Sequence, residues 1–291
     1  MTDAGTRDRD RVQSIERGVA VLRVFAGREG QLSMADVAAR ADLPRPVVRR
    51  ILITFEHLGY ARLHKGLWSL TPRILELGAG YFAASSLPEV SYPVMNEVVE
   101  RTGETCSLGV LDGFQVVHVG RVEDHRPMPG AIRIGMQLPA YATAIGKALL
   151  AHLPAEEVEE FLGSVELAAV TPSTVTDPDR LRERLALVRE RGFDLSVEEY
   201  TPGRLSAAVP IVLDDGAVGA IAVSATTARE TVETMEQTIV PVLLEAAEDI
   251  GRTYRAANPQ LYRSAGAWTT PGEGHTPGEG HTPGEGHTGP R

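Results

Sequence analysis

The sequence has only one cysteine and no long apolar run. Cys106 therefore has no partner for an internal disulfide bond, and no group of Cys and His residues has zinc-ligand spacing. The longest apolar stretches, such as residues 217–223, fall far short of the roughly 20 residues that cross a bilayer, and the opening MTDAGTRDRDR has no apolar signal core. We expect a soluble, cytoplasmic protein that uses no membrane, no metal and no other cofactor.

Acidic residues outnumber basic ones overall, but the excess lies in one part of the chain. The formal net charge is −10, yet residues 1–84 hold 13 Lys and Arg against 9 Asp and Glu, whereas the remaining residues hold 16 against 30. A basic head on an acidic body is typical of a DNA-reading module fused to a domain that does not touch DNA, although uneven charge without any function explains it equally well. At 291 residues we expect two domains and a tail.

The first 60 residues contain the start and stop signals of three helices. Residues 14–26 repeat apolar side chains at helical spacing. Ser33 has the properties of an N-cap, with Asp36 in the first turn of a short second helix. Pro44 and Pro46 then mark a turn followed by a new helix start, because proline suits only the first turn of a helix. The pattern predicts helix, tight turn, helix.

The third helix has an apolar back and a basic front. At about 100° per residue, its apolar side chains fall within about 120° of one another; these are Val48, Ile51, Leu52, Phe55 and Leu58. The front and exposed start carry Arg45, Pro46, Arg49, Arg50 and Ile53. Such a front can lie in a major groove, where arginine pairs with guanine edges or phosphates. Three charged residues alone are more often a solvent-exposed face that binds nothing. The following segment distinguishes this interpretation from DNA binding.

Residues 60–70 alternate apolar and polar side chains around a His64-Lys65-Gly66 tip, which predicts a β-hairpin. A hairpin directly after three helices makes a winged helix-turn-helix, with Arg62, His64 and Lys65 placed to touch the DNA backbone or minor groove. Ser33 completes the predicted DNA-contacting set. We place this domain at residues 13–71, after a disordered arm at 1–12.

A further helix, at residues 72–86, begins at Thr71-Pro72 and has a wide apolar stripe. The stripe consists of Ile74, Leu77, Gly78, Tyr81 and Phe82. A helix of this kind either packs on its own domain or pairs with a second chain. Because helix-turn-helix proteins usually read two half-sites, we favour dimerisation.

The body, residues 87–258, predicts an α+β domain. Its hairpins have Asp-Gly turns at 112–113 and 215–216, and helices are expected around 92–102, 177–191 and 231–257. Paired strands flanked by helices suggest a sheet with a helical cover on one face. The tail, residues 259–291, repeats TPGEGH three times and is expected to be disordered, because Pro/Gly-rich repeats cannot bury a core.

Several segments, in this order, resemble the IclR family of bacterial transcription regulators over residues 13–258. They are LPAYATAIGKALLA, GFDLSVEEYTPG and RLSAAVPI. LPAYAT, together with LTPRILELG and the LPE of residues 87–89, is most similar to the branch that controls protocatechuate, 4-hydroxybenzoate and β-ketoadipate breakdown. The resemblance implies a homodimer or dimer of dimers, whose GAF-like body binds a small-molecule organic acid effector and alters how the heads bind double-stranded operator DNA.

Carried over position by position, the resemblance also implies an effector site. The predicted residues are Cys106, Arg133, Thr143, Ala144, Ile145, Gly146, Ser196, Ser206, Ala222 and Ser224. Small side chains leave room for a ligand, hydroxyls offer hydrogen-bond donors, and the backbone N–H groups of a helix start favour an anion. For each serine, a hydroxyl satisfied within its own strand is an equally good interpretation.

Two departures from the family pattern affect this site. The family commonly has Leu-Arg after TPG, whereas this chain has Arg204-Leu205, and a period of two residues places a swapped pair on opposite sheet faces. Close relatives often carry Arg where Gln137 stands, and Arg133 lies four residues earlier. Either the carboxylate is held differently, or the effector is not the usual one of this branch.

Enzymatic interpretations find little support. Gly146-Lys147 lacks the earlier glycine of a phosphate loop, since Tyr141 stands there, and no G-x-S-x-G elbow occurs. His118 is best explained as a packed or edge histidine, and Glu198 and Glu199 would point to opposite faces of a strand. We expect no catalysis. The alternatives are an IclR-type regulator of another pathway, an enzyme with a DNA-binding head, and an architectural protein without an effector.

Overall fold

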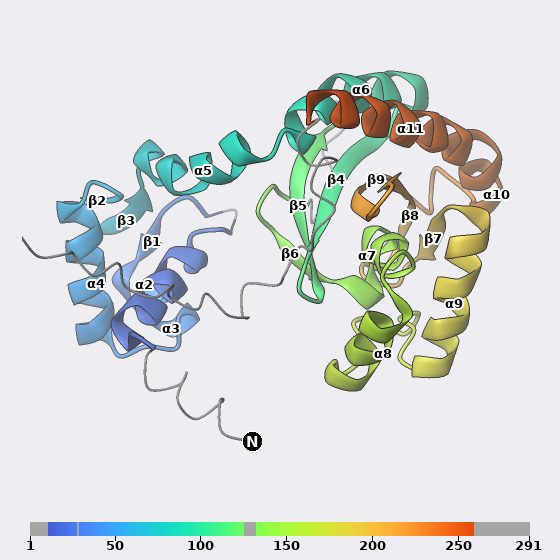
Figure 1. Ribbon diagram of the computed structural model, residues 1–291. Helices are drawn as coiled ribbons and strands as arrows, with labels where there is room; N and C mark the ends of the chain where they lie inside the picture. The colour runs from blue at the N-terminus through green and yellow to red at the C-terminus, as the bar shows by residue number, and fades with distance from the viewer. Residues whose placement is uncertain (1–10, 28, 125–131, 259–291) are drawn as a thin grey trace, which may run out of the picture. The chain divides into compact units, whose positions relative to one another are not determined.

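A computed structural model describes residues 11–27, 29–124 and 132–258 (Figure 1). Most of the expected arm and the whole TPGEGH tail lie outside the described residues. Within the described ranges, no helix is long and apolar enough to span a membrane.

The head is a winged helix-turn-helix, as predicted. It consists of α2 (Gln13–Val24), β1 (Leu32–Ser33), α3 (Met34–Arg40), α4 (Arg45–His57), β2 (Ala61–His64) and β3 (Leu67–Leu70). Ser33 caps α3, since its hydroxyl accepts a hydrogen bond from the Asp36 backbone N–H at 3.2 Å. At the wing tip Lys65 and Gly66 have φ of 49° and 80°, the left-handed pair that a tight hairpin turn requires.

The head has its own core, made by buried side chains from all three helices and the wing. Its larger buried side chains are Val21, Phe25, Leu32, Val37, Val48, Leu52 and Trp68. One predicted core residue is wrong: Leu58 is 46% exposed. It lies just after the last residue of α4, so the helical stripe no longer fixes its direction.

The junction is a 3-10 turn, η1 (Pro72–Leu75), followed by α5 (Glu76–Ala84). None of the nine residues of α5 is buried, although the helix is strongly apolar. The helix α6 (Leu87–Thr102) follows and starts five residues earlier than the predicted 92–102. Pro88 stands in its first turn, and a second proline, Pro93, lies inside the helix.

The body is built on one antiparallel sheet with the strand order β6-β5-β4-β9-β8-β7. The strands are β4 (Thr105–Asp112), β5 (Gln115–Val122), β6 (Gln137–Pro139), β7 (Asp194–Val197), β8 (Arg204–Leu213) and β9 (Gly216–Thr226). The helices are α7 (Ala144–Leu150) after the 3-10 turn η2 (Ala140–Ala142), then α8 (Ala155–Ser164), α9 (Pro178–Arg191), α10 (Val232–Thr234), the π-helical η3 (Met235–Ile239) and α11 (Val240–Ala257).

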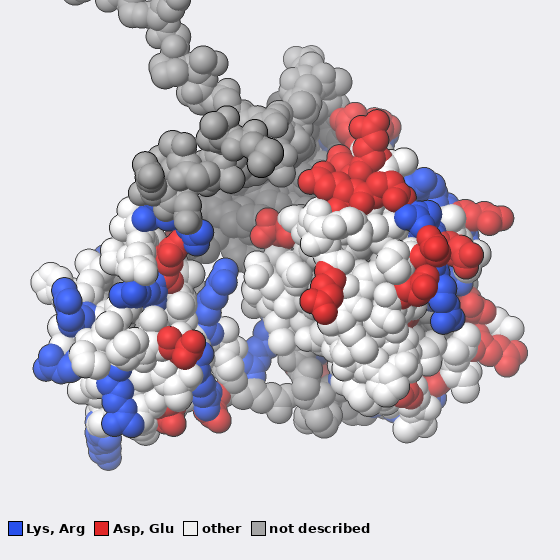
Figure 2. All heavy atoms as spheres, turned by 90° about the horizontal axis from the view of Figure 1, so that it is seen from below, with Lys and Arg blue, Asp and Glu red and all other residues white. Residues whose placement is uncertain are grey.

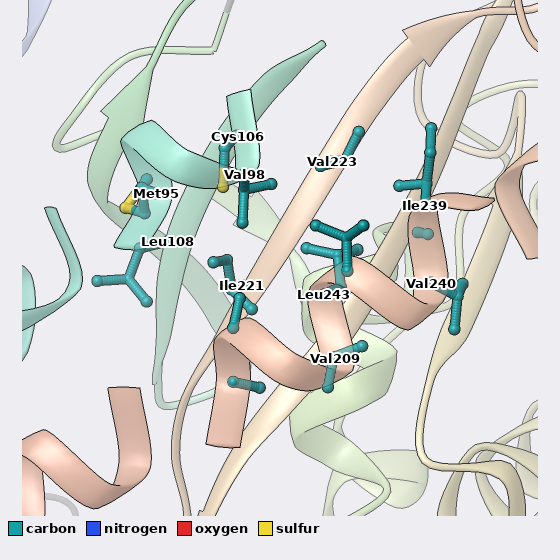
Figure 3. Close-up of a cluster of buried hydrophobic side chains, with 14 of the residues drawn as sticks. Met95, Val98, Cys106, Leu108, Val209, Ile221, Val223, Ile239, Val240 and Leu243 are labelled. Carbon is teal, nitrogen blue, oxygen red and sulfur yellow. The ribbon is translucent and has the colours of Figure 1, made fainter. Parts of the chain in front are cut away.

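Helices cover both faces of this sheet, which corrects the expected single cover (Figure 1). On one face α6 and α11 enclose the larger apolar core, in which Met95, Leu108, Ile221 and Leu243 meet (Figure 3). On the other face α7, α8 and α9 form a second core with Phe161. The sequence did not predict α8. Polar side chains collect in this second layer.

Candidate DNA-contacting surface and effector cavity

The front of α4 is exposed and basic, as its pattern predicts. Arg45, Pro46, Arg49, Arg50 and Ile53 all lie at the surface, and Ile53 is 41% exposed. Among the described residues none of these three guanidinium groups forms an ion pair with a carboxylate. Each therefore keeps its donors for another anion, and phosphate or a guanine edge fits the geometry of a guanidinium group.

The wing continues the basic surface. His64 and Lys65 are exposed at its tip, and Arg62 on β2 reaches across to β3, where its Nε donates a hydrogen bond to the Ser69 hydroxyl at 3.2 Å. On the face that Figure 2 shows, Lys and Arg predominate on the head, whereas Asp and Glu predominate on the body. The Ser33 hydroxyl is engaged in the α3 cap, donating to Asp36 at 2.6 Å.

A cavity with about 590 Å³ of empty space, part of it open to solvent, lies on the sheet face that α7 covers. Its walls come from all strands of the sheet, from the start of α7 and from the loop after β7. The lining residues are Ser107, His118, Ile132, Leu138, Ala142, Thr143, Ala144, Ile145, Ser196, Glu199, Tyr200, Thr201, Arg204, Ser206, Ala222 and Ser224. Apolar side chains mixed with a few polar groups are typical of the lining of small-molecule sites.

Hydroxyl groups dominate the floor of the cavity. Ser206 and Ser224 are directly opposite each other on β8 and β9, and their hydroxyl oxygens are 2.8 Å apart. Because one hydroxyl must donate to the other, the pair retains one proton for a ligand. Thr143 caps α7 instead, accepting a hydrogen bond from the Gly146 backbone N–H at 3.1 Å.

The basic end of the cavity is formed by Arg204. Desolvation lowers the pKa of Arg204, and the nearby positive charge of Arg121 lowers it further. Arg121 in turn donates a hydrogen bond to the Ser107 hydroxyl at 3.3 Å. Arg121 also forms an ion pair with Glu123 at 2.8 Å, and Arg204 is the arginine that lines the cavity. The Arg-Leu swap thus turns an arginine toward the cavity, while Leu205 lies in the α6–α11 core.

A buried ion network lies behind another part of the cavity wall. Lys147 on α7 is fully buried, and its Nζ lies 2.9 Å from Glu199 Oε2 and 3.5 Å from Asp194 Oδ2. Arg184 Nε approaches the other oxygen of Asp194 at 2.6 Å. Paired in this way the buried charges are compensated, as such groups require. Glu199 is the member of this network that reaches the cavity.

The position of Glu199 depends on a backbone reversal that follows β7. Glu198 has a φ of 56°, in the left-handed region, so the strand alternation ends before it. Hydroxyl groups fix this loop, since Thr171 donates to the Glu198 carbonyl at 2.7 Å and Thr174 donates to the Glu199 carbonyl at 2.6 Å. The expectation that both glutamates stand on a strand is therefore wrong.

His118 lines the cavity from β5. Here β5 contains a β-bulge, with Gly120 opposite Leu108 but His118 opposite Gly109, so that Val119 is an extra residue. The His118 side chain is 3% exposed, and its Nδ1 has no hydrogen-bond partner in the described structure. Burial lowers the pKa of His118 to about 4, against an opposing hydrogen bond with the Met136 backbone, and the charge of Arg121 lowers it further.

Of the ten residues predicted for the effector site, seven line this cavity; they are Thr143, Ala144, Ile145, Ser196, Ser206, Ala222 and Ser224. Cys106 does not, because it faces the α6–α11 core, where burial raises the pKa of its thiol. Arg133 does not line it either, although its neighbour Ile132 does. Gly146 is a glycine because a Cβ there would overlap the Ala140 backbone, and its N–H is bound to Thr143.

Metal chemistry finds no support in the described ranges. No group of three or more His, Cys, Asp or Glu side chains in them could hold a metal ion. The acidic side chains nearest the cavity are instead committed to Lys147 and Arg184.

An arginine-fronted winged helix joined to a domain with a polar cavity defines a ligand-responsive transcription regulator. Comparison with known proteins identifies the family to which this regulator belongs. The family model described as the bacterial transcriptional regulator IclR C-terminal domain matches residues 80–252, and the IclR helix-turn-helix domain matches residues 14–64. The chain therefore belongs to the IclR family, and it is a DNA-binding regulator and not an enzyme.

Named relatives agree with this assignment. The chain is 33% identical over 249 residues to the Pca regulon regulatory protein of Pseudomonas putida, covering 85% of this chain and 86% of that protein. It is 37% identical to a transcriptional regulator from Rhodococcus sp. RHA1 of known structure, with a TM-score of 0.74, covering 85% of this chain and all of that one. An IclR homologue from Microbacterium hydrocarbonoxydans, solved in complex with 4-hydroxybenzoate, is 30% identical, with a TM-score of 0.72 and coverage of 84% and 99%.

Proposed function

We propose that this regulator is a cytoplasmic homodimer, or dimer of dimers, that senses a small organic acid of aromatic breakdown. The cavity carries the proposal: it joins apolar walls to a row of hydroxyls and to Arg204, a combination that suits a planar carboxylic acid. The complex of the Microbacterium homologue with 4-hydroxybenzoate supports the same class of ligand. The alternative is an acid of another pathway, because the Arg204-Leu205 swap departs from the family pattern.

DNA contact is assigned to the front of α4 and to the wing. Arg45, Arg49 and Arg50 are the candidates for the major groove, while Lys65 and Arg62 suit the backbone or the minor groove. Dimerisation is assigned to α5, because its apolar side chains have no cover within the described chain: Leu77 is 59%, Tyr81 45% and Phe82 47% exposed.

The test of effector binding is calorimetry with 4-hydroxybenzoate and protocatechuate. We expect Ala144→Trp to abolish binding, because Ala144 lines the cavity and an indole ring would fill it. Ser206→Ala should weaken binding by about 0.5–1.5 kcal/mol, the usual contribution of one hydrogen bond. In the absence of ligand, both variants should bind operator DNA as the wild type does.

Two controls make the result decisive. Circular dichroism of Ala144→Trp establishes that the variant is folded, and a thermal-shift assay measures binding independently, because a ligand at 100 times its Kd stabilises a protein by about 2.7 kcal/mol. Equal affinity in wild type and Ala144→Trp would place the effector elsewhere. No binding of any aromatic acid by the wild type would remove the proposed ligand class.

A further inference from the structure

Ser196 and Glu199 form a part of the cavity wall that offers a ligand hydrogen-bond acceptors but no donor. Both residues line the cavity. The Ser196 hydroxyl donates to Glu199 Oε1 at 3.2 Å, while Lys147 Nζ donates to Glu199 Oε2 at 2.9 Å and to the Ser196 hydroxyl oxygen at 3.5 Å. A hydroxyl has one proton and a carboxylate has none, so the proton of Ser196 is committed and only lone pairs are left for a ligand.

The carboxylate of Glu199 keeps capacity for a further hydrogen bond. The two oxygens of a carboxylate accept about four hydrogen bonds, and the contacts with Ser196 and Lys147 use one on each oxygen. The Glu199 side chain is 8% exposed, whereas Lys147, which supplies its counter-charge, is fully buried and lies outside the cavity lining. A ligand therefore meets the carboxylate and not the ammonium group.

The charges behind this wall are already balanced. In the described structure the network joins three cations to three carboxylates at distances between 2.6 and 4.0 Å; they are Lys147, Arg184 and Arg191 with Asp194, Glu199 and Glu236. A carboxylate of the ligand would place an uncompensated negative charge beside Glu199, and an ammonium group would place a positive charge beside Lys147. The group that fits this wall is an uncharged donor, and a hydroxyl group is such a donor.

We propose that Glu199 restricts the effector to an acid with one carboxylate and a hydroxyl group, and that Glu199 accepts the hydrogen bond of that hydroxyl. Arg204, a side chain with donors only, lines the same cavity and takes the single carboxylate. Lys147 positions the Glu199 carboxylate without touching the ligand. This inference rests on the proposed organic-acid effector and narrows it, because acids with two carboxylates are excluded.

Calorimetry on the full chain at pH 7 tests the inference with benzoate, 4-hydroxybenzoate and terephthalate, which differ only in the group opposite the carboxylate. The pair of 3-hydroxybenzoate and isophthalate repeats the comparison with that group at the neighbouring ring position. We expect the wild type to bind the better hydroxybenzoate at least about tenfold more tightly than benzoate or the matching dicarboxylate, because hydrogen bonds to charged groups are the strong ones.

Glu199→Gln keeps the size of the side chain but removes its negative charge, while Lys147 stays positive. In this variant the preference for the hydroxybenzoate over the matching dicarboxylate should fall at least about tenfold, with the affinity for benzoate changed by about twofold or less. Glu198→Gln is the matched control, since it removes the same charge one residue earlier, from a partly buried side chain outside the cavity lining. It should keep the wild-type preference.

Circular dichroism establishes that the variants are folded. If Glu199→Gln does not fold, the double variant Lys147→Gln and Glu199→Gln removes both members of the pair and leaves Asp194 with Arg184, and the same loss of preference is expected. A wild type that binds the dicarboxylate as tightly as the hydroxybenzoate, or a folded Glu199 variant that keeps the wild-type preference, overturns the role of Glu199 and leaves the organic-acid effector in place. Absence of heat from every acid overturns the effector class together with this inference.

Discussion

Lys147 is a residue whose environment contradicts its usual preference, since an ammonium group is rarely fully buried. Removing such an ion from water costs several kcal/mol, and only close carboxylates with good geometry offset that cost. Glu199 and Asp194 provide them, and Arg184 balances the second carboxylate. The network therefore adds little net stability. It connects α7 to the loop after β7, and each of these two segments forms a wall of the cavity.

Replacing Lys147 by methionine should destabilise the protein by about 3–5 kcal/mol, because it leaves Glu199 buried without a cation. Urea unfolding followed by circular dichroism measures the change. Arg101→Met is the matched control, since it removes an ion pair with Glu245 whose side chains are 49% and 63% exposed. That variant should change the free energy of unfolding far less, and losses of similar size would mean that burial of the Lys147 pair has no special effect.

Individual site residues were predictable to different degrees. Ser206, Ser224 and Ala144 follow from the resemblance, and the cavity contains them. His118 was interpreted as a packed or edge histidine, and it is buried, but strand alternation cannot show that it also lines a cavity. Glu199 was not predicted as a cavity residue because Glu198, the residue before it, has a left-handed φ that interrupts the two-residue alternation of the strand.

At the level of elements, α4 has two faces with different roles, one packed in the core of the head and one exposed to solvent. Val48 and Leu52 on its back are completely buried and hold it to α2, α3 and the wing. Its front makes no contribution to that core, since Arg49 and Arg50 are exposed. Substitutions on the front should therefore change DNA affinity without changing the stability of the head.

The double variant Arg49→Ala and Arg50→Ala should lose operator affinity, by about 1–3 kcal/mol for each arginine that reads a base. Fluorescence anisotropy on an operator fragment selected with the wild-type protein measures the loss. An arginine that binds phosphate would instead weaken all sequences alike.

Arg252→Ala, on the exposed surface of α11, serves as the control for lost charge and should bind DNA as the wild type does. Thermal unfolding should show the head of the double variant intact. Wild-type operator affinity in that variant would remove α4 from the DNA interface.

The elements with strong local signals were the ones the sequence predicted. Apolar periodicity identified α2 and α4, and the Lys65-Gly66 and Asp-Gly turns identified the hairpins. Short elements had no such signal, since β1 has two residues and becomes a strand only by pairing with β3. Long-range packing places helices on the second face of the sheet, which no local pattern indicates.

For the whole molecule, the exposed apolar helix α5 is the feature that a single chain leaves unexplained. None of its residues is buried within the described chain, and the proposed dimer would cover this face with a second copy. A symmetric pair places the same surface on both partners and brings two heads to one DNA site.

Leu77→Glu should dissociate the dimer, because two buried carboxylates would face each other across a symmetric interface. Analytical ultracentrifugation measures the association state, and binding to a fragment with two half-sites should weaken in parallel. Val232→Glu, an equally charged change at an exposed valine in α10, should remain dimeric. A Leu77→Glu protein that sediments as a dimer would assign the α5 surface to another contact.

The two faces of the body sheet have a consequence for how such regulators diversify. The α6–α11 face holds the large apolar core, whereas the face under α7 presents small and hydroxylated side chains to a cavity. Because strand alternation separates the two sets, a gene duplicate can exchange cavity residues while its folding core stays untouched. The Arg204-Leu205 pair shows the separation, since Arg204 lines the cavity and Leu205 lies in the α6–α11 core. A change at a cavity position alone can therefore alter chemical preference one residue at a time.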